Sequence, residues 1–297
     1  MNSSEKITLG RFEVHELPDG AVLYFDPKAH AYYSEVKASN KAEGGYSYAR
    51  GSRLPGVSTI SKFVDQGGDG LLYWAAGLEV IGVAELAAEA IEAEADLTWL
   101  GDPAEIRRRL KEAGREWQDV RDRAAHVGTV AHEQALQALA EGEVPDLATF
   151  TEAERPFARA VMSWWHDRAP VVLDTEAVTY SPSKGYAGRF DLRCRLVIEE
   201  AEVTVLVDAK TRDKGKVRLT DYVQLAGYEA ANRECGIGGS DRQLALILMP
   251  DGTYREEWSV AVETDFYAAL NAYNASKAVA KRMSAAEKAK DDQRRSA

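Results

Sequence analysis

The sequence predicts an α/β protein built around a mixed β-sheet, and the order of its segments is the main reason. Three β-prone segments, at about residues 171–180, 187–197 and 203–210, follow one another without a helix between them. A helical segment at about residues 220–233 comes next, and the apolar run at residues 243–249 has the length of a buried strand. This order of strands and helices is typical of a layered α/β domain with strands of mixed direction.

The first part of the chain is expected to form short strands and then a helix. Residues 21–25 have the composition of a strand, and residues 40–51 contain the glycines and serines typical of a loop. A helix that is capped by Ser58 or Thr59 is predicted to run through Phe63.

The glycine-rich residues 67–70 are expected to break the chain before an alanine-rich helix at residues 71–95. We therefore divide the chain into two parts. Residues 1–100 form a β-then-helical N-terminal extension, which we expect to be a lid or a channel wall, and residues 101–297 form the core domain.

Further helices are predicted on either side of the β-prone segments. One runs from about residue 117 to 140, and another covers residues 152–168, whose aromatic side chains recur at helical spacing and are expected to pack in the core. Residues 257–262 are expected to add a strand, and residues 265–288 a C-terminal amphipathic helix.

A hairpin between the second and third β-prone segments brings two acids together. If Glu199 and Glu200 form its turn, residues whose numbers add up to 399 face each other, so Asp191 faces Asp208. Carboxylates about 5 Å apart at Cβ repel each other unless a cation lies between them. Lys210 projects to the same side as Asp208, and a hard divalent cation is the natural partner of the two acids. The register is inferred, so a solvated hairpin with scattered charges remains the alternative.

Four short motifs extend this pattern over about residues 118–260. They are Gly128-Thr-Val-Ala-His132, Gly188-Arg-Phe-Asp191, Asp208-Ala-Lys210 and Gln224-Leu-Ala-Gly-Tyr228. Their order resembles the RecB-like branch of the PD-(D/E)XK nucleases. The stretch from Leu54 to Ile60, followed by Trp74, is also similar to exonucleases of this branch that phages carry. The resemblance implies a restriction-endonuclease-like PD-(D/E)XK core with an N-terminal extension and a C-terminal helix.

The resemblance also implies a role for each residue of the first three motifs. Asp191 and Asp208 would hold one or two Mg²⁺ or Mn²⁺ ions, together with the carbonyl of Ala209 and, in the RecB-like manner, His132. Such ions supply an activated water and neutralise the phosphate in phosphodiester hydrolysis. Lys210 would position the water or stabilise the phosphate. An unshifted lysine has a pKa of about 10.4, so it stays protonated near neutral pH and does not act as a base. A lone histidine bonded to a carbonyl is the structural alternative for His132.

Three further residues are candidates for the catalytic site. Gln224 and Tyr228 lie four positions apart and share a helix face, so they contact the nucleic-acid backbone, support Lys210, or simply pack the helix on the sheet. Glu176 resembles a glutamate often found on the preceding strand in the family, with a role near the metal ions.

Basic residues close to these motifs are candidate phosphate contacts. Arg189 precedes Asp191 by two positions, and a basic run directly follows Lys210. The predicted nucleic-acid-binding residues are Arg189, Arg212, Lys214, Lys216 and Arg218.

Composition limits the alternatives. The chain has 297 residues and a formal net charge of −11, which argues against a broadly basic nucleic-acid-binding surface, although the acids are concentrated in residues 79–102. Two cysteines are too few for the four-cysteine iron–sulfur cluster of some RecB-like nucleases, and they favour a cytoplasmic protein. The most apolar long window, residues 71–91, contains three glutamates, so no membrane span is expected.

These observations together predict a divalent-metal-dependent deoxyribonuclease. An exonuclease of DNA recombination, repair or processing, encoded by a phage and working with a single-strand annealing or recombination partner, fits the resemblance best. A structure-specific endonuclease with the same site, and a non-catalytic DNA-binding or assembly module of the same fold, are the alternatives, because fold alone does not fix function.

Overall fold

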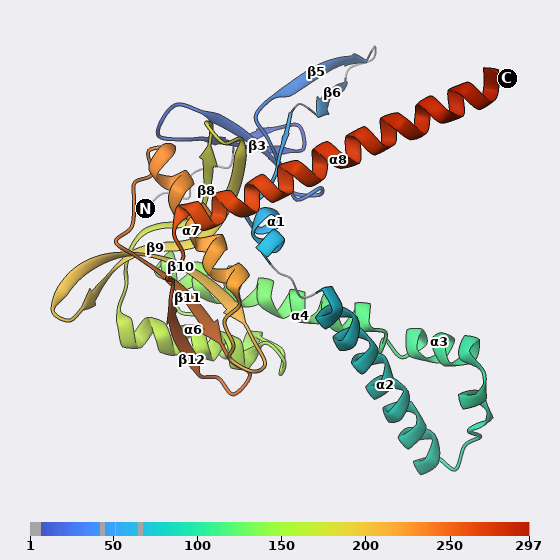
Figure 1. Ribbon diagram of the computed structural model, residues 1–297. Helices are drawn as coiled ribbons and strands as arrows, with labels where there is room; N and C mark the ends of the chain where they lie inside the picture. Colours follow the sequence, from blue (N-terminus) through green and yellow to red (C-terminus); the bar gives the residue numbers. More distant parts are fainter. Residues whose placement is uncertain (1–6, 42–44, 51, 65–67, 297) are drawn as a thin grey trace.

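The computed structural model describes residues 7–41, 45–50, 52–64 and 68–296, and it confirms a mixed α/β fold (Figure 1). The central sheet has five strands in the order β12-β11-β10-β9-β8. Its strands are β8 (Val171–Ser181), β9 (Tyr186–Ile198), β10 (Ala201–Thr211), β11 (Arg242–Leu248) and β12 (Tyr254–Trp258). Only β10 and β11 run parallel, and helix α7 (Leu219–Glu234) connects them.

The last strand of this sheet, β12, begins before the strand that was predicted at residues 257–262, so the predicted position was wrong. A tight turn ends β11 and starts β12, with the amide of Gly252 donating to the carbonyl of Met249. Gly252 has a φ of 83°, a left-handed conformation that glycine adopts at little cost. The turn therefore allows β12 to begin at Tyr254 instead of a few residues later.

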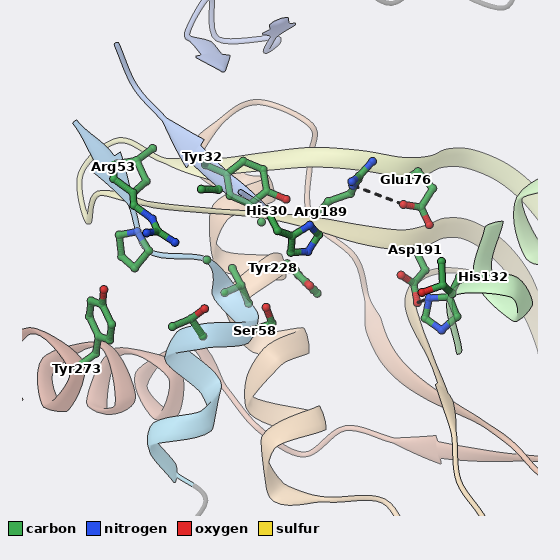
Figure 2. Close-up of a pocket in the computed structure, with 18 of the residues that line it drawn as sticks. His30, Tyr32, Arg53, Ser58, His132, Glu176, Arg189, Asp191, Tyr228 and Tyr273 are labelled. Carbon is green, nitrogen blue, oxygen red and sulfur yellow. Dashed lines mark ion pairs between the residues drawn. The ribbon is translucent and has the colours of Figure 1, made fainter. Parts of the chain in front are cut away.

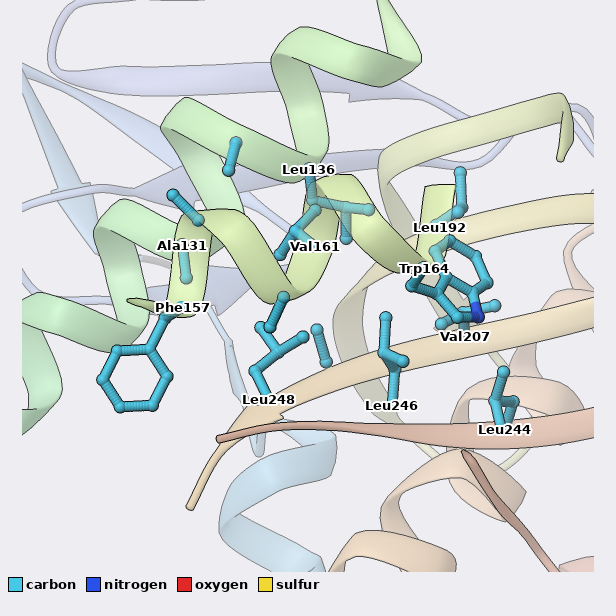
Figure 3. Close-up of a cluster of buried hydrophobic side chains, with 14 of the residues drawn as sticks. Ala131, Leu136, Phe157, Val161, Trp164, Leu192, Val207, Leu244, Leu246 and Leu248 are labelled. Carbon is cyan, nitrogen blue, oxygen red and sulfur yellow. The ribbon is translucent and has the colours of Figure 1, made fainter. Parts of the chain in front are cut away.

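Helices cover both faces of the central sheet. One face carries α6 (Arg155–Arg168) and a long bent helix made of α4 (Trp117–Val130), the π-helical segment η3 (Ala131–Leu136) and α5 (Gln137–Ala140). Alternate strand residues point to this layer, where Leu192, Val207 and Leu246 pack against Val161 and Trp164 (Figure 3). The predicted helix at residues 152–168 therefore does bury its aromatic face.

The opposite face of the sheet is covered by α7, by the short helix α1 (Val57–Ser61) and by the start of α8 (Glu263–Ser296). Leu206 and Ile247 point to this side, between the residues that face α6. The core is thus a three-layer arrangement with a sheet that is buried on both faces, as expected for a sheet containing a crossover helix.

A second, smaller sheet forms the N-terminal part of the molecule. Its order is β1-β2-β3-β4-β7, with β1 (Thr8–Leu9), β2 (Phe12–Glu16), β3 (Val22–Asp26), β4 (Ala31–Tyr33) and β7 (Arg53–Leu54). The predicted loop at residues 40–51 was wrong, because β5 (Val36–Lys41) and β6 (Gly45–Arg50) pair as an antiparallel hairpin. Tyr46 and Tyr48 alternate with small residues there, a strand pattern that outweighs the glycine and serine content.

Helix α1 begins two or three residues earlier than predicted, because its N-cap is Gly56 and not Ser58 or Thr59. Gly56 occupies the N-cap position, and its carbonyl accepts from the amides of Thr59 and Ile60, whereas neither Ser58 nor Thr59 caps the helix with its side chain. Gly56 also forms an isolated parallel bridge with Ala187, which ties the start of α1 to β9.

A helical arm extends from the body (Figure 1). It consists of α2 (Gly68–Glu92) and α3 (Pro103–Glu112), and short 3-10 turns occur at Lys62–Val64, Thr98–Gly101 and Leu147–Thr149. Gly67 of the predicted glycine break lies outside the described residues, and the prediction was wrong for residues 68–70, which already belong to α2. Within the described part of the chain, no helix combines the length and the apolar character that crossing a membrane requires.

Candidate functional site

The β9–β10 hairpin has the register that the sequence predicted. Its paired residues run from Ala201 and Ile198 to Val207 and Leu192, so their numbers add up to 399, and the ladder ends one step before Asp208 and Asp191. Glu199 and Glu200 form the turn with φ values of 49° and 67°. Asp191 and Asp208 are 8 % and 2 % exposed, and the charge of Asp191 raises the pKa of Asp208, so the two buried acids lie near each other.

Asp191 is held by two donors. The amide of Ala209 donates to its Oδ2 at 2.7 Å, and Nδ1 of His132 lies 3.3 Å from the same oxygen. Burial by itself raises the pKa of Asp191, but His132, Lys210 and the Ala209 amide outweigh burial and hold the pKa below its usual value. Asp191 is therefore a carboxylate, and it raises the pKa of buried His132 in return.

Asp208 is paired with Lys210 on the same face of β10. The Lys210 Nζ forms an ion pair with Asp208 Oδ2. Burial, with a smaller contribution from Asp191, raises the pKa of Asp208 to about 6, although Lys210 opposes this shift. Burial would lower the pKa of Lys210, but Asp208 and Asp191 outweigh it and raise the pKa, so Lys210 is a fixed cation and not a base.

Gln224 and Tyr228 extend this group of polar side chains from α7. Nε2 of Gln224 donates to Oδ1 of Asp208 at 3.3 Å and to the hydroxyl of Tyr228 at 2.8 Å. Burial, and then the two aspartates, raise the pKa of Tyr228 well above its usual value, so its hydroxyl stays protonated. Gln224 thus supports the buried Asp208–Lys210 pair, and Tyr228 also packs α7 on the sheet with its ring edge-on to Phe190, so the structure contains contacts for two of the three alternatives.

His132 lies within a π-helical segment of an otherwise α-helical rod. A π-helical turn contains about one residue more than an α-helical turn, so η3 changes which side chains face β9. Such segments are frequent at functional sites. Four residues earlier, Gly128 faces β10, where an added Cβ would lie 3.4 Å from Oγ1 of Thr211. The helix therefore comes close to β10 at this glycine.

Glu176 and Arg189 form the next part of the site. Their side chains lie on β8 and β9, with Nε of Arg189 3.6 Å from Oε2 of Glu176, and the guanidinium of Arg189 also lies over the ring of Phe25. Glu176 has a φ of 47°, a left-handed conformation that costs energy for a residue other than glycine. Burial, and then the charge of Asp191, raise the pKa of Glu176 to about 7.

A cavity of about 460 Å³ connects these residues to the N-terminal part of the chain. Figure 2 shows His132, Asp191 and Glu176 towards one end and Arg53 and Tyr273 towards the other. Six residues of the stretch from Leu54 to Ile60, which the sequence linked to phage exonucleases, line the cavity, so part of the N-terminal region lies beside the site.

Several residues of the cavity wall were not singled out from the sequence. They are His30, Tyr32, Arg53, Thr129, Glu133, Tyr273 and Lys277. Glu133 directly follows His132 and Thr129 lies within the motif that ends at His132, so both could have been found from their neighbours. The others come from β4 and the turn before it, from β7 and from α8, which only the tertiary fold brings together. Of Trp74, which accompanied the exonuclease-like stretch, the structure describes no side chain.

The basic run after Lys210 divides into two groups. Arg212 is bound within the protein, because its Nη2 donates to both oxygens of Asp221 at 2.8 and 3.0 Å. Lys214, Lys216 and Arg218 are exposed in the irregular segment before α7. Only the exposed group is available to a ligand.

The donor set at the sheet centre is suitable for a divalent cation. Within the described residues, no three His, Cys, Asp or Glu side chains already converge as a metal-binding group. Instead His132 and Lys210, both with raised pKa values, balance the two aspartates. Ligand atoms about 2.1 Å from an octahedral ion are about 3 Å apart, and the 3.3 Å between His132 Nδ1 and Asp191 Oδ2 is close to that separation. The residues therefore fit a hard cation, which would take over the charge balance that His132 and Lys210 now provide.

Comparisons with known proteins do not add an identity to this geometry. No family model matches the chain, and no curated protein is similar enough to count as a relative.

Proposed function

We propose that the protein is a divalent-metal-dependent nuclease with a PD-(D/E)XK-type core, acting on DNA from an end. The observation that carries the proposal is the buried group of Asp191, Asp208 and Lys210, of which Asp191 lines the cavity. Burying two carboxylates on neighbouring strands, with an amine two positions further on the same face, costs free energy of folding. Such groups are therefore frequent at functional sites.

Each residue has a defined part in the proposed reaction. Asp191, Asp208, His132 and the Ala209 carbonyl would hold Mg²⁺ or Mn²⁺, which when bound supplies an activated water and neutralises negative charge on the phosphate. Lys210, as a fixed ammonium, orients the water or stabilises the charge on the phosphate oxygens. Gln224 keeps the Asp208–Lys210 pair in place through its bonds to Asp208 and Tyr228.

The test is cleavage of labelled linear DNA with Mg²⁺ or Mn²⁺ by the wild-type protein and by Asp208→Asn and Asp191→Asn variants. Loss of a metal-held transition state should lower the rate by at least about 10³-fold, equivalent to about 4 kcal/mol. EDTA should have the same effect on the wild-type protein. The matched control is Asp26→Asn, since Asp26 is an equally buried acid that pairs with Arg11 in the N-terminal sheet.

Three outcomes separate the alternatives. Retained cleavage in either site variant, with native folding by circular dichroism, contradicts the proposed site. DNA binding without cleavage in any metal favours a non-catalytic module. Rapid cutting of covalently closed circles favours an endonuclease, because an enzyme that starts from an end does not act on them.

A further inference from the structure

Helix α8 leaves the body of the protein after its first turns (Figure 1). Phe266 and Leu270 anchor its start, buried in the cluster formed with α7 and α1. From Asn274 to Asp292, every side chain is exposed. This part of the helix adds nothing to the hydrophobic core, so its charges are the feature that requires an explanation.

The exposed part of α8 is basic in an acidic protein. The whole chain has a formal net charge of −11, whereas residues 277–295 contain seven Lys or Arg and three Asp or Glu. Residues 79–102, in α2 and the segment before α3, show the opposite pattern, with seven Asp or Glu and no Lys or Arg. A negatively charged ligand is therefore attracted to the exposed part of α8 and repelled by residues 79–102.

The lysines of α8 continue the face that packs against the body. Lys277, Lys281 and Lys288 follow Tyr273 at intervals of four, four and seven residues, which keeps them on one side of the helix. We call Tyr273, Lys277, Lys281 and Lys288 the α8 stripe. At a rise of 1.5 Å per residue, its three lysines span about 17 Å.

The α8 stripe begins inside the candidate site. Tyr273 and Lys277 line the cavity, opposite the end that contains Asp191 and His132 (Figure 2). Tyr273 is held by an edge-on contact with Phe63, and Lys277 Nζ lies 5.5 Å from the centre of the Tyr273 ring. A chain of phosphates that left the cavity at this end would meet Lys281 and then Lys288.

We propose that the α8 stripe binds the backbone of a single nucleic-acid strand as the strand passes between the cavity and solvent. The inference rests on the proposed function, because it identifies what reaches the same site. A cavity of about 460 Å³ has the size of a small-molecule pocket, so a short part of one nucleic-acid strand fits into it and a duplex does not. Evenly spaced ammonium groups suit a repeating phosphate, and the aromatic ring of Tyr273 suits an unstacked base.

A matched pair of double variants tests this proposal. Lys281→Gln with Lys288→Gln removes two charges from the α8 stripe, and Arg282→Gln with Lys290→Gln removes two exposed charges from other faces of the same helix. Binding of fluorescein-labelled oligothymidylate is measured by anisotropy in EDTA, which prevents cleavage, over a range of salt concentrations. Loss of two phosphate contacts should reduce the slope of log K against log salt by about 1.4 in the stripe variant. The control variant should keep the wild-type slope.

Substrate length supplies a second readout. With Mg²⁺ or Mn²⁺, the stripe variant should cleave a long single strand with a lower kcat/KM and cleave a trinucleotide, which does not reach Lys281, at the wild-type rate. Equal slopes and equal rates in the two double variants would overturn the stripe while leaving the nuclease assignment intact. Wild-type binding with the expected slope, but no cleavage in any metal, would remove the nuclease assignment and keep the stripe.

A protein partner predicts a different result. If the α8 stripe binds the acidic α2 of a second copy, sedimentation should show a wild-type dimer that only the stripe variant loses, and the salt slope for oligothymidylate should not change. That result would overturn the proposal.

Discussion

Charged residues have opposite environments in the sheet centre and in the helical arm. Asp191 and Asp208 are almost completely buried, and each has a cationic partner within the protein. In the arm, Arg108 pairs with Glu105 and Glu112 along the surface of α3, where solvent screens each pair. Burying a charge costs free energy, whereas exposing one costs almost nothing, so a buried acid requires an explanation that a solvated one does not.

The difference explains why a strongly acidic net charge is a poor guide to this protein's ligands. Most of the negative charge that distinguishes the arm is solvated and lies on α2 and the segment after it. The few residues on which the proposed chemistry depends are balanced locally and contribute little to the overall field. Three predictions test whether the buried charges act as a functional unit and the arm charges do not.

The largest effect is expected for Lys210. Lys210→Gln removes the fixed ammonium beside Asp208, so the rate of DNA cleavage at saturating metal should fall by about 10²–10³-fold, as for other lost electrostatic contacts to a transition state. Steady-state kinetics should place the loss in kcat more than in KM. Lys184→Gln is the control, since Lys184 is exposed in the turn between β8 and β9. A kcat within tenfold of the wild-type value would show that Lys210 only balances Asp208.

The hairpin that carries this lysine could be predicted closely from the sequence. Val203 to Val207 is a β-prone run that is apolar except for Thr204, and two adjacent glutamates supply the turn, so the register of the hairpin could be predicted from the sequence. The helices that cover the sheet followed from their apolar spacing in the same way. The local pattern of apolar residues was sufficient to predict each helix or strand that buries one face.

The cavity wall could not be predicted in the same way. Arg53, His30 and Lys277 come from β7, the turn before β4, and α8, and their proximity depends on how the small sheet and the last helix pack against the central sheet. The π-helical turn at His132 likewise leaves no clear mark in residue spacing. Contacts between distant segments are decided by packing, on which a single sequence carries little information.

An intermediate effect is expected for metal binding as a function of pH. Asp208 and Glu176, with pKa values of about 6 and about 7, and His132, with a raised pKa, must lose protons before they can act as metal ligands or neighbours of a metal. Binding therefore releases protons, so affinity for Mn²⁺ should rise with pH and level off above about pH 8. At Mn²⁺ concentrations about 100-fold above Kd, the unfolding temperature should rise by about 5 °C.

Differential scanning fluorimetry between about pH 5.5 and pH 8 measures this shift. Asp191→Asn should show no Mn²⁺-dependent shift at any pH. Glu176→Gln should keep the shift and extend it to lower pH, because it removes one of the competing protons. A shift that is the same at both ends of the pH range would mean that Mn²⁺ binds elsewhere.

The smallest effect is expected for a substitution of a charged residue in the arm. One pair of substitutions compares the loss of stability there with the loss in the body of the protein. Asp221 accepts two bonds from Arg212 and one from the amide of Arg218, and it is 3 % exposed. Asp221→Asn leaves Arg212 without its counter-charge in a buried setting, so stability should fall by about 3 kcal/mol. Glu89 makes an equally short ion pair with Arg115, but on the exposed surface between α2 and the segment before α4.

Glu89→Gln should change the unfolding temperature by less than about 2 °C, because the lost attraction is screened and both side chains regain rotamer freedom. Raising the salt concentration should remove even this difference, whereas the effect of Asp221→Asn should persist, since buried pairs are screened much less. Both proteins can be compared by chemical denaturation at low and high salt. A large, salt-resistant loss in the Glu89 variant would show that the arm, like the sheet centre, depends on charges that water does not reach.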